Sequence, residues 1–180
     1  MMTIETLATQ GYNNTHATLA GIDTQRLRSM RNAGLRACFR RMEDIAGRLE
    51  FVATVRGRQY YNDAASRNVS STWYSLESLS GGLIWITIGT KAEVDYSRLL
   101  AVVQRRVRMI LVLGDADGLR KAFGPVVSEI KECGSMAEAL KEAYFYDSTD
   151  VKVIFSPGID DPALPSDMLS GLFTQEVNEL

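Results

Sequence analysis

From residue 47 onward, short and almost continuously apolar runs alternate with longer amphipathic stretches. The apolar runs, which predict buried strands, are residues 83–88, 109–113, 126–130 and 151–155. The amphipathic stretches, which predict helices, are residues 69–79, 96–107, 119–123 and 135–146. Strands that are buried on both faces have little polar alternation. The pattern therefore predicts an α/β, Rossmann-like fold in which a mostly parallel sheet carries helices on both faces.

The two ends of this region add one hairpin and one helix. Residues 49–55 and 59–61 are rich in strand formers and flank the turn sequence Arg56-Gly57-Arg58, which predicts an antiparallel hairpin leading into the sheet. Near the C-terminus, apolar residues recur at helical spacing. The predicted final helix is expected to present Met168, Leu172, Phe173 and Val177 on one apolar stripe.

Residues 1–46 have a different character. Residues 1–12 are polar and predict a loose leader, whereas apolar side chains between Leu27 and Ile45 gather on one side of a helical wheel. Asn32 and Gly34 predict a break into two helices. The arginines of this segment scatter around its polar side, which favours a solvated face over a nucleic-acid groove. We therefore divide the chain into a helical N-terminal extension, residues 1–46, and a domain formed by residues 47–180.

Composition narrows the functional classes. The 180 residues carry a net charge of −2, so no overall field favours nucleic acid or a membrane as a partner. Two cysteines, Cys38 and Cys133, predict reduced thiols, and the single His16 argues against a histidine-rich metal site. We find no apolar run of membrane-spanning length and no signal-peptide pattern, and we expect a cytoplasmic protein.

Ligands of open α/β sheets bind beyond the carboxyl ends of the strands. Here these ends lead into loops at residues 62–68, 89–95, 114–118 and 156–161. Asp160 and Asp161 in the last loop are either a pair of acids at a site or an acidic N-terminus for the final helix. The second reading needs fewer assumptions, because Pro162 follows and acids favour a helix N-terminus.

Several short segments match one known family in order and spacing. They are Gly47-Arg48-Leu49-Glu50, Tyr61-Asn62-Asp63, Asn68-Val69, Ser71 to Ser78, Ile84-Trp85-Ile86, Ser135 to Ala139 and Phe155-Ser156-Pro157. Together they resemble the C-terminal domain of the Mur ligases, in particular those that add D-glutamate to UDP-N-acetylmuramoyl-L-alanine in peptidoglycan synthesis. A weaker match around Leu19-Ala20-Gly21-Ile22 resembles helices that close the central domain of that family.

The resemblance implies a mechanism that needs three domains. In the family, ATP bound at a glycine-rich loop of the central domain phosphorylates the substrate carboxylate, and the amine of the amino acid attacks the acyl phosphate. No Gly-x-x-x-x-Gly-Lys-Ser/Thr segment occurs in these 180 residues. Because phosphoryl transfer depends on such positioning groups, we do not expect the chain to ligate by itself.

Some positions that the resemblance assigns to ligands are retained. It implies nucleotide binding by Arg48, Asn62 and Asp63, and ligand binding by Ser156. Arg48 and Asp63 have a second reading, as a structural pair that joins the hairpin to the first loop. We assign no catalytic residue and no metal ligand from the sequence.

Other positions differ from the family. A lysine of the family loop is Ala65 here, and the threonine that helps to hold D-glutamate is Arg67. The amino-acid-binding lysine is Ala92, although the neighbouring Lys91 is a candidate substitute. Asp161 replaces a serine that receives the substrate carboxylate, and a carboxylate there repels such a ligand.

These differences predict a degenerate, MurD-like and non-catalytic domain that binds a partner or a small ligand in connection with peptidoglycan precursor synthesis. The expected partners are a second copy of the chain or an intact Mur ligase. The alternative is the C-terminal part of an ATP-dependent D-glutamate ligase that works with a separate ATP-binding half. ATP and Mg²⁺ are expected as cofactors only if the family activity is retained.

Overall fold

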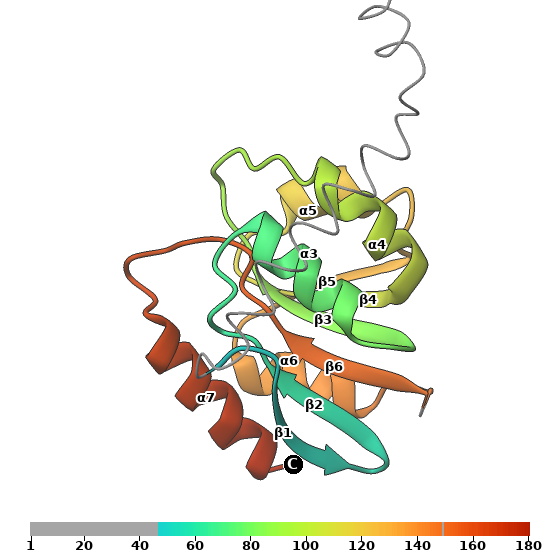
Figure 1. Cartoon of the computed structure of the whole chain (residues 1–180), viewed down its shortest axis with the longest axis vertical. Coiled ribbons are helices and arrows are strands. Elements are labelled where there is room, and N and C mark those ends of the chain that lie inside the picture. The colour runs from blue at the N-terminus through green and yellow to red at the C-terminus, as the bar shows by residue number, and fades with distance from the viewer. Residues whose placement is uncertain (1–46, 149) are drawn as a thin grey trace, which may run out of the picture. The chain divides into compact units, whose positions relative to one another are not determined.

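Figure 1 shows the computed structural model of the protein, which describes residues 47–148 and 150–180. Within these residues, six strands form one sheet in the order β1-β2-β6-β3-β4-β5. The strands are β1 (Glu50–Val55), β2 (Arg58–Asn62), β3 (Gly82–Ile88), β4 (Val107–Leu113), β5 (Glu129–Cys133) and β6 (Val151–Phe155). Of these six strands, β1 alone runs antiparallel to its neighbour, β2. The predicted α/β fold with a hairpin and a mostly parallel sheet is confirmed.

Helices connect the parallel strands and cover both faces of the sheet. They are α3 (Val69–Ser78), the short 3₁₀ helix η1 (Ser97–Leu99), α4 (Leu100–Arg106), α5 (Asp117–Phe123), α6 (Met136–Tyr144) and α7 (Ser166–Asn178). In Figure 1, α3 and α4 lie in front of the sheet and α6 lies behind it. Alternate residues of each central strand therefore enter different halves of the core.

Aromatic contacts mark the two halves of the core. On the face that packs against α6, Phe155 of β6 stacks on Phe173 of α7 with ring centroids 5.5 Å apart. On the other face, Trp85 of β3 meets Phe123 of α5 edge to face at 6.0 Å. All four side chains are fully buried. Both faces of β3 and β6 are therefore covered, which explains why their sequences are uninterrupted apolar runs.

Local hydrogen bonds fix where two helices begin. Asn68 caps α3 by accepting a hydrogen bond from Ser71 N–H at 2.9 Å, while Ser71 Oγ accepts one from Asn68 N–H at 3.3 Å. Ser135 caps α6 in the same way, accepting from Glu138 N–H at 3.1 Å. Such caps satisfy backbone N–H groups of the first helical turn. The first cap also places the loop after β2, which carries several candidate site residues.

The turn of the hairpin leads into a buried arginine. Arg56 and Gly57 adopt positive φ angles of 50° and 78°, which lets the two strands turn back tightly. Arg58 follows, and its guanidinium donates to the backbone carbonyls of Ala143, Tyr144, Tyr146 and Ser148. It thereby satisfies carbonyl groups at and beyond the end of α6. The sequence assigned Arg58 only to the turn.

The predicted strand at residues 126–130 was placed too early. Val126 N–H and Val127 N–H both bond to Phe123 O at 2.9 Å, so these residues turn the chain at the end of α5. The strand is Glu129–Cys133 instead. Because β5 pairs only with β4 and lies at the sheet edge, it tolerates the polar sequence Glu-Ile-Lys-Glu-Cys, which carries no apolar run.

The apolar stripe predicted for the last helix was also partly wrong. Phe173 and Val177 are buried as expected, and Leu169 completes their row. Met168 and Leu172, however, are 50% and 39% exposed. Positions 169, 173 and 177 follow one another at i, i+4 and i+8, so they share a side of the helix. Met168 and Leu172 lie one residue away, which turns them by about 100° from that side.

The N-terminal extension predicted for residues 1–46, with its two helices, His16 and Cys38, lies outside the described residues. The boundary at residues 46 and 47 stays a prediction for the same reason.

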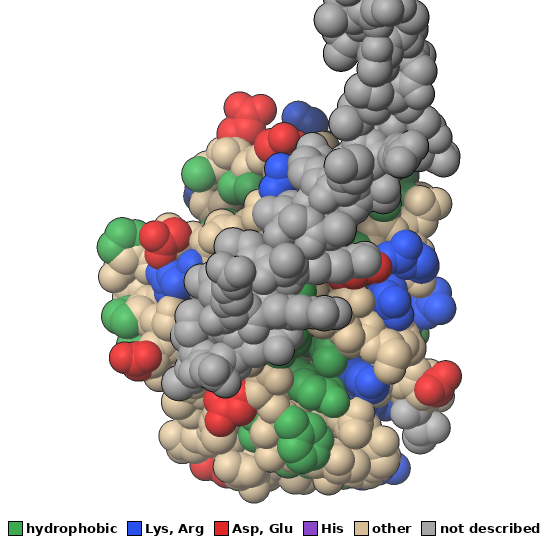
Figure 2. Space-filling model, in the orientation of Figure 1, with side chains coloured by type: hydrophobic (Ala, Val, Ile, Leu, Met, Phe, Trp, Pro, Cys, Tyr) green, Lys and Arg blue, Asp and Glu red, His purple; other side chains and the backbone are tan. Residues whose placement is uncertain are grey.

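Of the helices in the described part of the chain, none has the length and apolar character to cross a membrane. The face seen in Figure 2 carries Lys and Arg side chains over α4 and a mixture of acidic and basic side chains elsewhere.

Candidate functional site

A pocket of about 380 Å³ opens beyond the carboxyl ends of β3 and β6. From β3 the chain winds outward to β4 and β5, and it then returns to place β6 on the other side of β3. The loops of β3 and β6 therefore diverge, which is where open α/β sheets bind ligands. We call this the switch-point pocket. Its lining residues are Arg67, Asn68, Val69, Thr90, Ala92, Val94, Gly158, Ile159, Asp160, Asp161 and Pro162.

Arg48 and Asp63, two predicted nucleotide contacts, lie next to each other inside the domain. Leu49 N–H donates to Asp63 Oδ1 over 3.2 Å, and the Arg48 guanidinium lies over the Tyr74 ring at 5.6 Å. Asp63 is fully buried and Arg48 is nearly so. The first contact joins the residue before β1 to the loop after β2, and the second joins Arg48 to α3. The reading of Arg48 and Asp63 as a structural pair stays a prediction. Nucleotide binding by either residue stays a prediction.

Burial is the main cause of the shifted pKa of the Asp63 carboxyl. Removal from water raises the pKa of its carboxyl from 3.8 to about 6, because the charged form loses its hydration. The hydroxyls of Ser75, Ser66 and Ser156 and the charge of Arg48 lower this pKa without cancelling the effect of burial. None of these hydroxyls makes a hydrogen bond of ordinary geometry to Oδ2 within the described part of the chain.

Asn62 and Ser156, the next two predicted site residues, also use their polar groups internally. Asn62 Nδ2 donates to Ser170 Oγ at 2.7 Å, and Asn62 Oδ1 accepts from Ala64 N–H at 3.2 Å. Ser156 Oγ lies 2.9 Å from Thr72 Oγ1, and Ser156 O accepts from Trp85 Nε1–H at 2.9 Å. Both residues are fully buried. Their predicted ligand contacts are untested.

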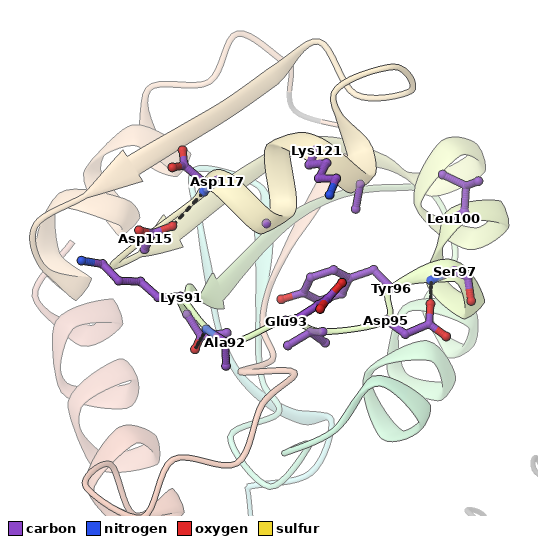
Figure 3. A pocket seen from close by; sticks show the side chains of 14 residues that line it. Lys91, Ala92, Glu93, Asp95, Tyr96, Ser97, Leu100, Asp115, Asp117 and Lys121 are labelled. Atoms are coloured by element: carbon purple, nitrogen blue, oxygen red, sulfur yellow. Dashed lines mark hydrogen bonds between the residues drawn. The ribbon is translucent and has the colours of Figure 1, made fainter.

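Lys91, the last predicted ligand-binding residue, lies elsewhere. It borders a wider depression of about 1330 Å³ formed by the loops after β3 and β4 and by the first turns of α5. Figure 3 shows its side chain extended beside Asp115 and directed away from Tyr96 at the centre of that depression. Lys91 is exposed and does not line the switch-point pocket. Its role as a substitute for the family lysine remains a prediction.

Arg67 is the residue whose role sequence reasoning missed. Its Nε–H donates to Asp160 Oδ1 at 2.7 Å, and its two terminal nitrogens donate to the backbone carbonyls of Leu164 and Asp161. A further contact joins Nη1 to Ser166 Oγ at 3.5 Å. The Arg67 side chain is 17% exposed, against 76% for Asp160. The sequence did contain one indication of this ion pair. Arg67 lies in one of the loops at the carboxyl ends of the strands, and Asp160 and Asp161 lie in another.

The same contacts correct the reading of the two aspartates. α7 begins only at Ser166, so Asp160 and Asp161 precede its first turn by several residues. They are too far away to favour its dipole, which acts over the first turn. Asp160 instead pairs with Arg67, and Asp161 Oδ1 accepts from Ala163 N–H at 2.9 Å within a turn.

The charges that line the switch-point pocket do not suit a carboxylate ligand. Its described lining residues include two carboxylates, those of Asp160 and Asp161, against the single guanidinium of Arg67. That guanidinium is already paired. Ala92 lies at the same pocket and brings no charge. Within residues 47–148 and 150–180, no group of three acidic, cysteine or histidine side chains is arranged to hold a metal ion.

Among solved structures, the chain is similar to a MurF ligase of Thermotoga maritima in complex with ADP. It is 12% identical, with a TM-score of 0.47 over 75% of this chain and 32% of that chain. A domain of a putative UDP-N-acetylmuramate:L-alanyl-γ-D-glutamyl-meso-diaminopimelate ligase from Haemophilus ducreyi is 10% identical. Its TM-score is 0.49 over 72% of this chain and 99% of that one. No protein-family model matches the sequence.

Curated relatives carry the stronger similarity. The UDP-N-acetylmuramoylalanine–D-glutamate ligase of Porphyromonas gingivalis is 34% identical over 158 residues, which are 87% of this chain and 35% of the ligase. The corresponding ligase of Christiangramia forsetii is 32% identical over 84% of this chain and 34% of its own. The chain thus spans about a third of the length of these relatives. Because the identity extends over most of the chain, the predicted resemblance is confirmed, and the protein belongs to the Mur ligase family.

Proposed function

We propose that this protein is a non-catalytic, MurD-like domain that binds a partner or a small ligand in connection with peptidoglycan precursor synthesis. The observation that carries the proposal is the state of Arg67. It is the only cation among the described residues that line the switch-point pocket, and its guanidinium is bound by the chain's own segment 160–166. No cationic group of that lining is therefore left unpaired to attract the carboxylates of an amino acid.

The chemistry of ligation supports the same proposal. Activation of a carboxylate by ATP needs groups that hold the phosphates and stabilise the charge of the transferring phosphoryl. The sequence has no glycine-rich loop ending in Gly-Lys-Ser/Thr. The polar groups of Arg48, Asn62 and Asp63 are buried within the domain. The part of the chain that the structure describes therefore presents few of the groups that the reaction requires.

An assay of ADP release tests the proposal. The protein is incubated with ATP, Mg²⁺, D-glutamate and UDP-N-acetylmuramoyl-L-alanine, and the Porphyromonas gingivalis ligase serves as the positive control. We expect release at the level of a blank without protein. Turnover that is lost when Asp63 is replaced by asparagine, in a variant that still folds, would refute the non-catalytic proposal.

A second candidate function is the C-terminal part of a ligase whose ATP-binding half is a separate chain. The identity of Arg48, Asn62 and Asp63 at family positions favours it. For this role the loop after β2 would have to expose Asp63 when the other half binds. Mixing the protein with the isolated ATP-binding part of a relative discriminates the two proposals. Restored ligation supports the second, and no ligation together with no complex in size-exclusion chromatography argues against it.

A further inference from the structure

The guanidinium of Arg67 lies in a set of acceptors that all come from one short segment. They are Asp160 Oδ1, Asp161 O, Leu164 O and Ser166 Oγ, and we call this set the guanidinium cradle. A guanidinium carries five N–H donors in one plane. Nε, Nη1 and Nη2 each reach at least one acceptor of the cradle. This geometry matches a planar fork rather than a point charge.

The cradle and its occupant belong to different parts of the chain. Arg67 lies in the loop between β2 and α3, whereas the cradle is formed by the loop after β6 and by Ser166, the first residue of α7. The cradle has hydrogen bonds of its own. Leu164 N–H donates to Asp161 O at 3.0 Å, and Ala163 N–H donates to Asp161 Oδ1 at 2.9 Å. The turn that presents the acceptors is therefore held partly without Arg67.

Three of the four cradle oxygens, those of the Asp160 carboxylate and of the Asp161 and Leu164 carbonyls, can only accept hydrogen bonds, whereas the Ser166 hydroxyl can also donate one. One of the four oxygens belongs to a carboxylate. A second carboxylate, that of Asp161, adjoins it at the same pocket. An anion placed there would meet acceptors and like charge, and both would repel it. A guanidinium satisfies the acceptors and neutralises the charge, and hydrogen bonds between ionised groups are among the stronger ones in proteins.

We propose that residues 160–166 form a guanidinium-binding site at the edge of the switch-point pocket, and that Arg67 fills this site in cis. Its ligand class is an alkyl guanidinium, such as the side chain of arginine. This site and the proposed function both rest on the bound state of Arg67, but the site is tested by binding of a guanidinium and not by ligation, so the two proposals can fail separately. The site prefers a cation, whereas a pocket that binds the carboxylates of an amino acid is expected to prefer an anion.

Chemical rescue tests this site. In Arg67→Ala the cradle is empty, and methylguanidinium is added as the probe at concentrations well below those that denature proteins. We expect a saturable rise in the melting temperature of the variant and saturable NMR shifts of the Asp161, Leu164 and Ser166 amides. The wild-type protein should show neither effect, since its cradle is occupied. Methylammonium, a point cation at equal concentration, should rescue less well.

A second variant ties the rescue to the cradle. In Arg67→Ala combined with Asp160→Asn, the affinity for methylguanidinium should fall several-fold, because the charged acceptor is lost. If Arg67→Ala does not fold alone, refolding with and without methylguanidinium decides the matter, and folding that depends on the probe supports the site. Equal effects of methylguanidinium on wild type and variant, or no saturable response in the variant, would overturn the proposal.

Discussion

Leu49 N–H and the Asp63 carboxylate are joined by a hydrogen bond of 3.2 Å, although 14 residues separate them along the chain. The bond links the segment that precedes β1 to the loop that follows β2. It uses an oxygen of a fully buried carboxyl. Because a buried acid is costly to ionise, the burial of Asp63 makes the stability of the domain sensitive to pH.

We predict that stability falls as the pH rises from about 4 to about 6. The folded-state pKa of Asp63, about 6, lies above its ordinary value of 3.8, so in this interval the folded protein binds more protons than the unfolded chain. Above this interval the contribution is constant. A shift of this size corresponds to a loss on the order of 1–3 kcal/mol. Urea unfolding across the pH range measures it.

The substitution Asp63→Asn should flatten that pH profile, because the amide does not titrate. Asp167→Asn, at the exposed start of α7, serves as the control, and this variant should show the same dependence of stability on pH as the wild type. If the Asp63→Asn variant keeps the full decline between pH 4 and 6, another group is responsible for it.

We predict that Arg58→Ala strongly destabilises the domain. The substitution leaves the carbonyls of Ala143, Tyr144, Tyr146 and Ser148 without their charged donor. Loss of such buried, charge-assisted bonds should lower the free energy of unfolding by about 3 kcal/mol. The control is Arg105→Ala, which removes the exposed ion pair with Glu77 and should cost less than about 1 kcal/mol. Similar losses in both variants would contradict the role given to Arg58.

Two glycines make a matched pair for a test of close packing. A Cβ atom at Gly89 would lie 2.0 Å from Asp115 O, so the loops after β3 and β4 would have to separate. We expect Gly89→Ala to cost at least about 2 kcal/mol. Gly171→Ala, in the open middle of α7, meets no atom within 4 Å and should stabilise the helix by up to about 1 kcal/mol. Thermal unfolding of both variants measures the contrast, and equal shifts would disprove this account of Gly89.

The orientation of α7 is tested by two leucines. Leu169 is buried in the core, whereas Leu172 is 39% exposed. Leu169→Ala should cost about 2–5 kcal/mol, and Leu172→Ala should cost less than about 1 kcal/mol. Denaturant unfolding provides the measurement. A larger loss for Leu172→Ala would show that this face is covered, which would favour the predicted second copy or Mur ligase partner.

Local pattern was sufficient to predict most secondary structure of residues 47–180. Strands such as β3 and β6 are covered on both faces, and that burial leaves an apolar run that can be read directly. The pattern was misleading where burial is one-sided. The edge strand β5 has a polar sequence, and the side of α7 that packs inward depends on a shift of one residue between Met168 and Leu169.

The loops that form the candidate site could also be located in advance, because the carboxyl ends of parallel strands lie at one edge of a sheet. What each side chain does there depended on tertiary structure. Arg67 and Asp160 are 93 residues apart, and Arg58 reaches Ala143 across 85 residues. The periodicity of a sequence indicates which neighbouring residues along the chain are buried. The partner of a charged side chain, in contrast, depends on which distant loops the folded sheet brings together.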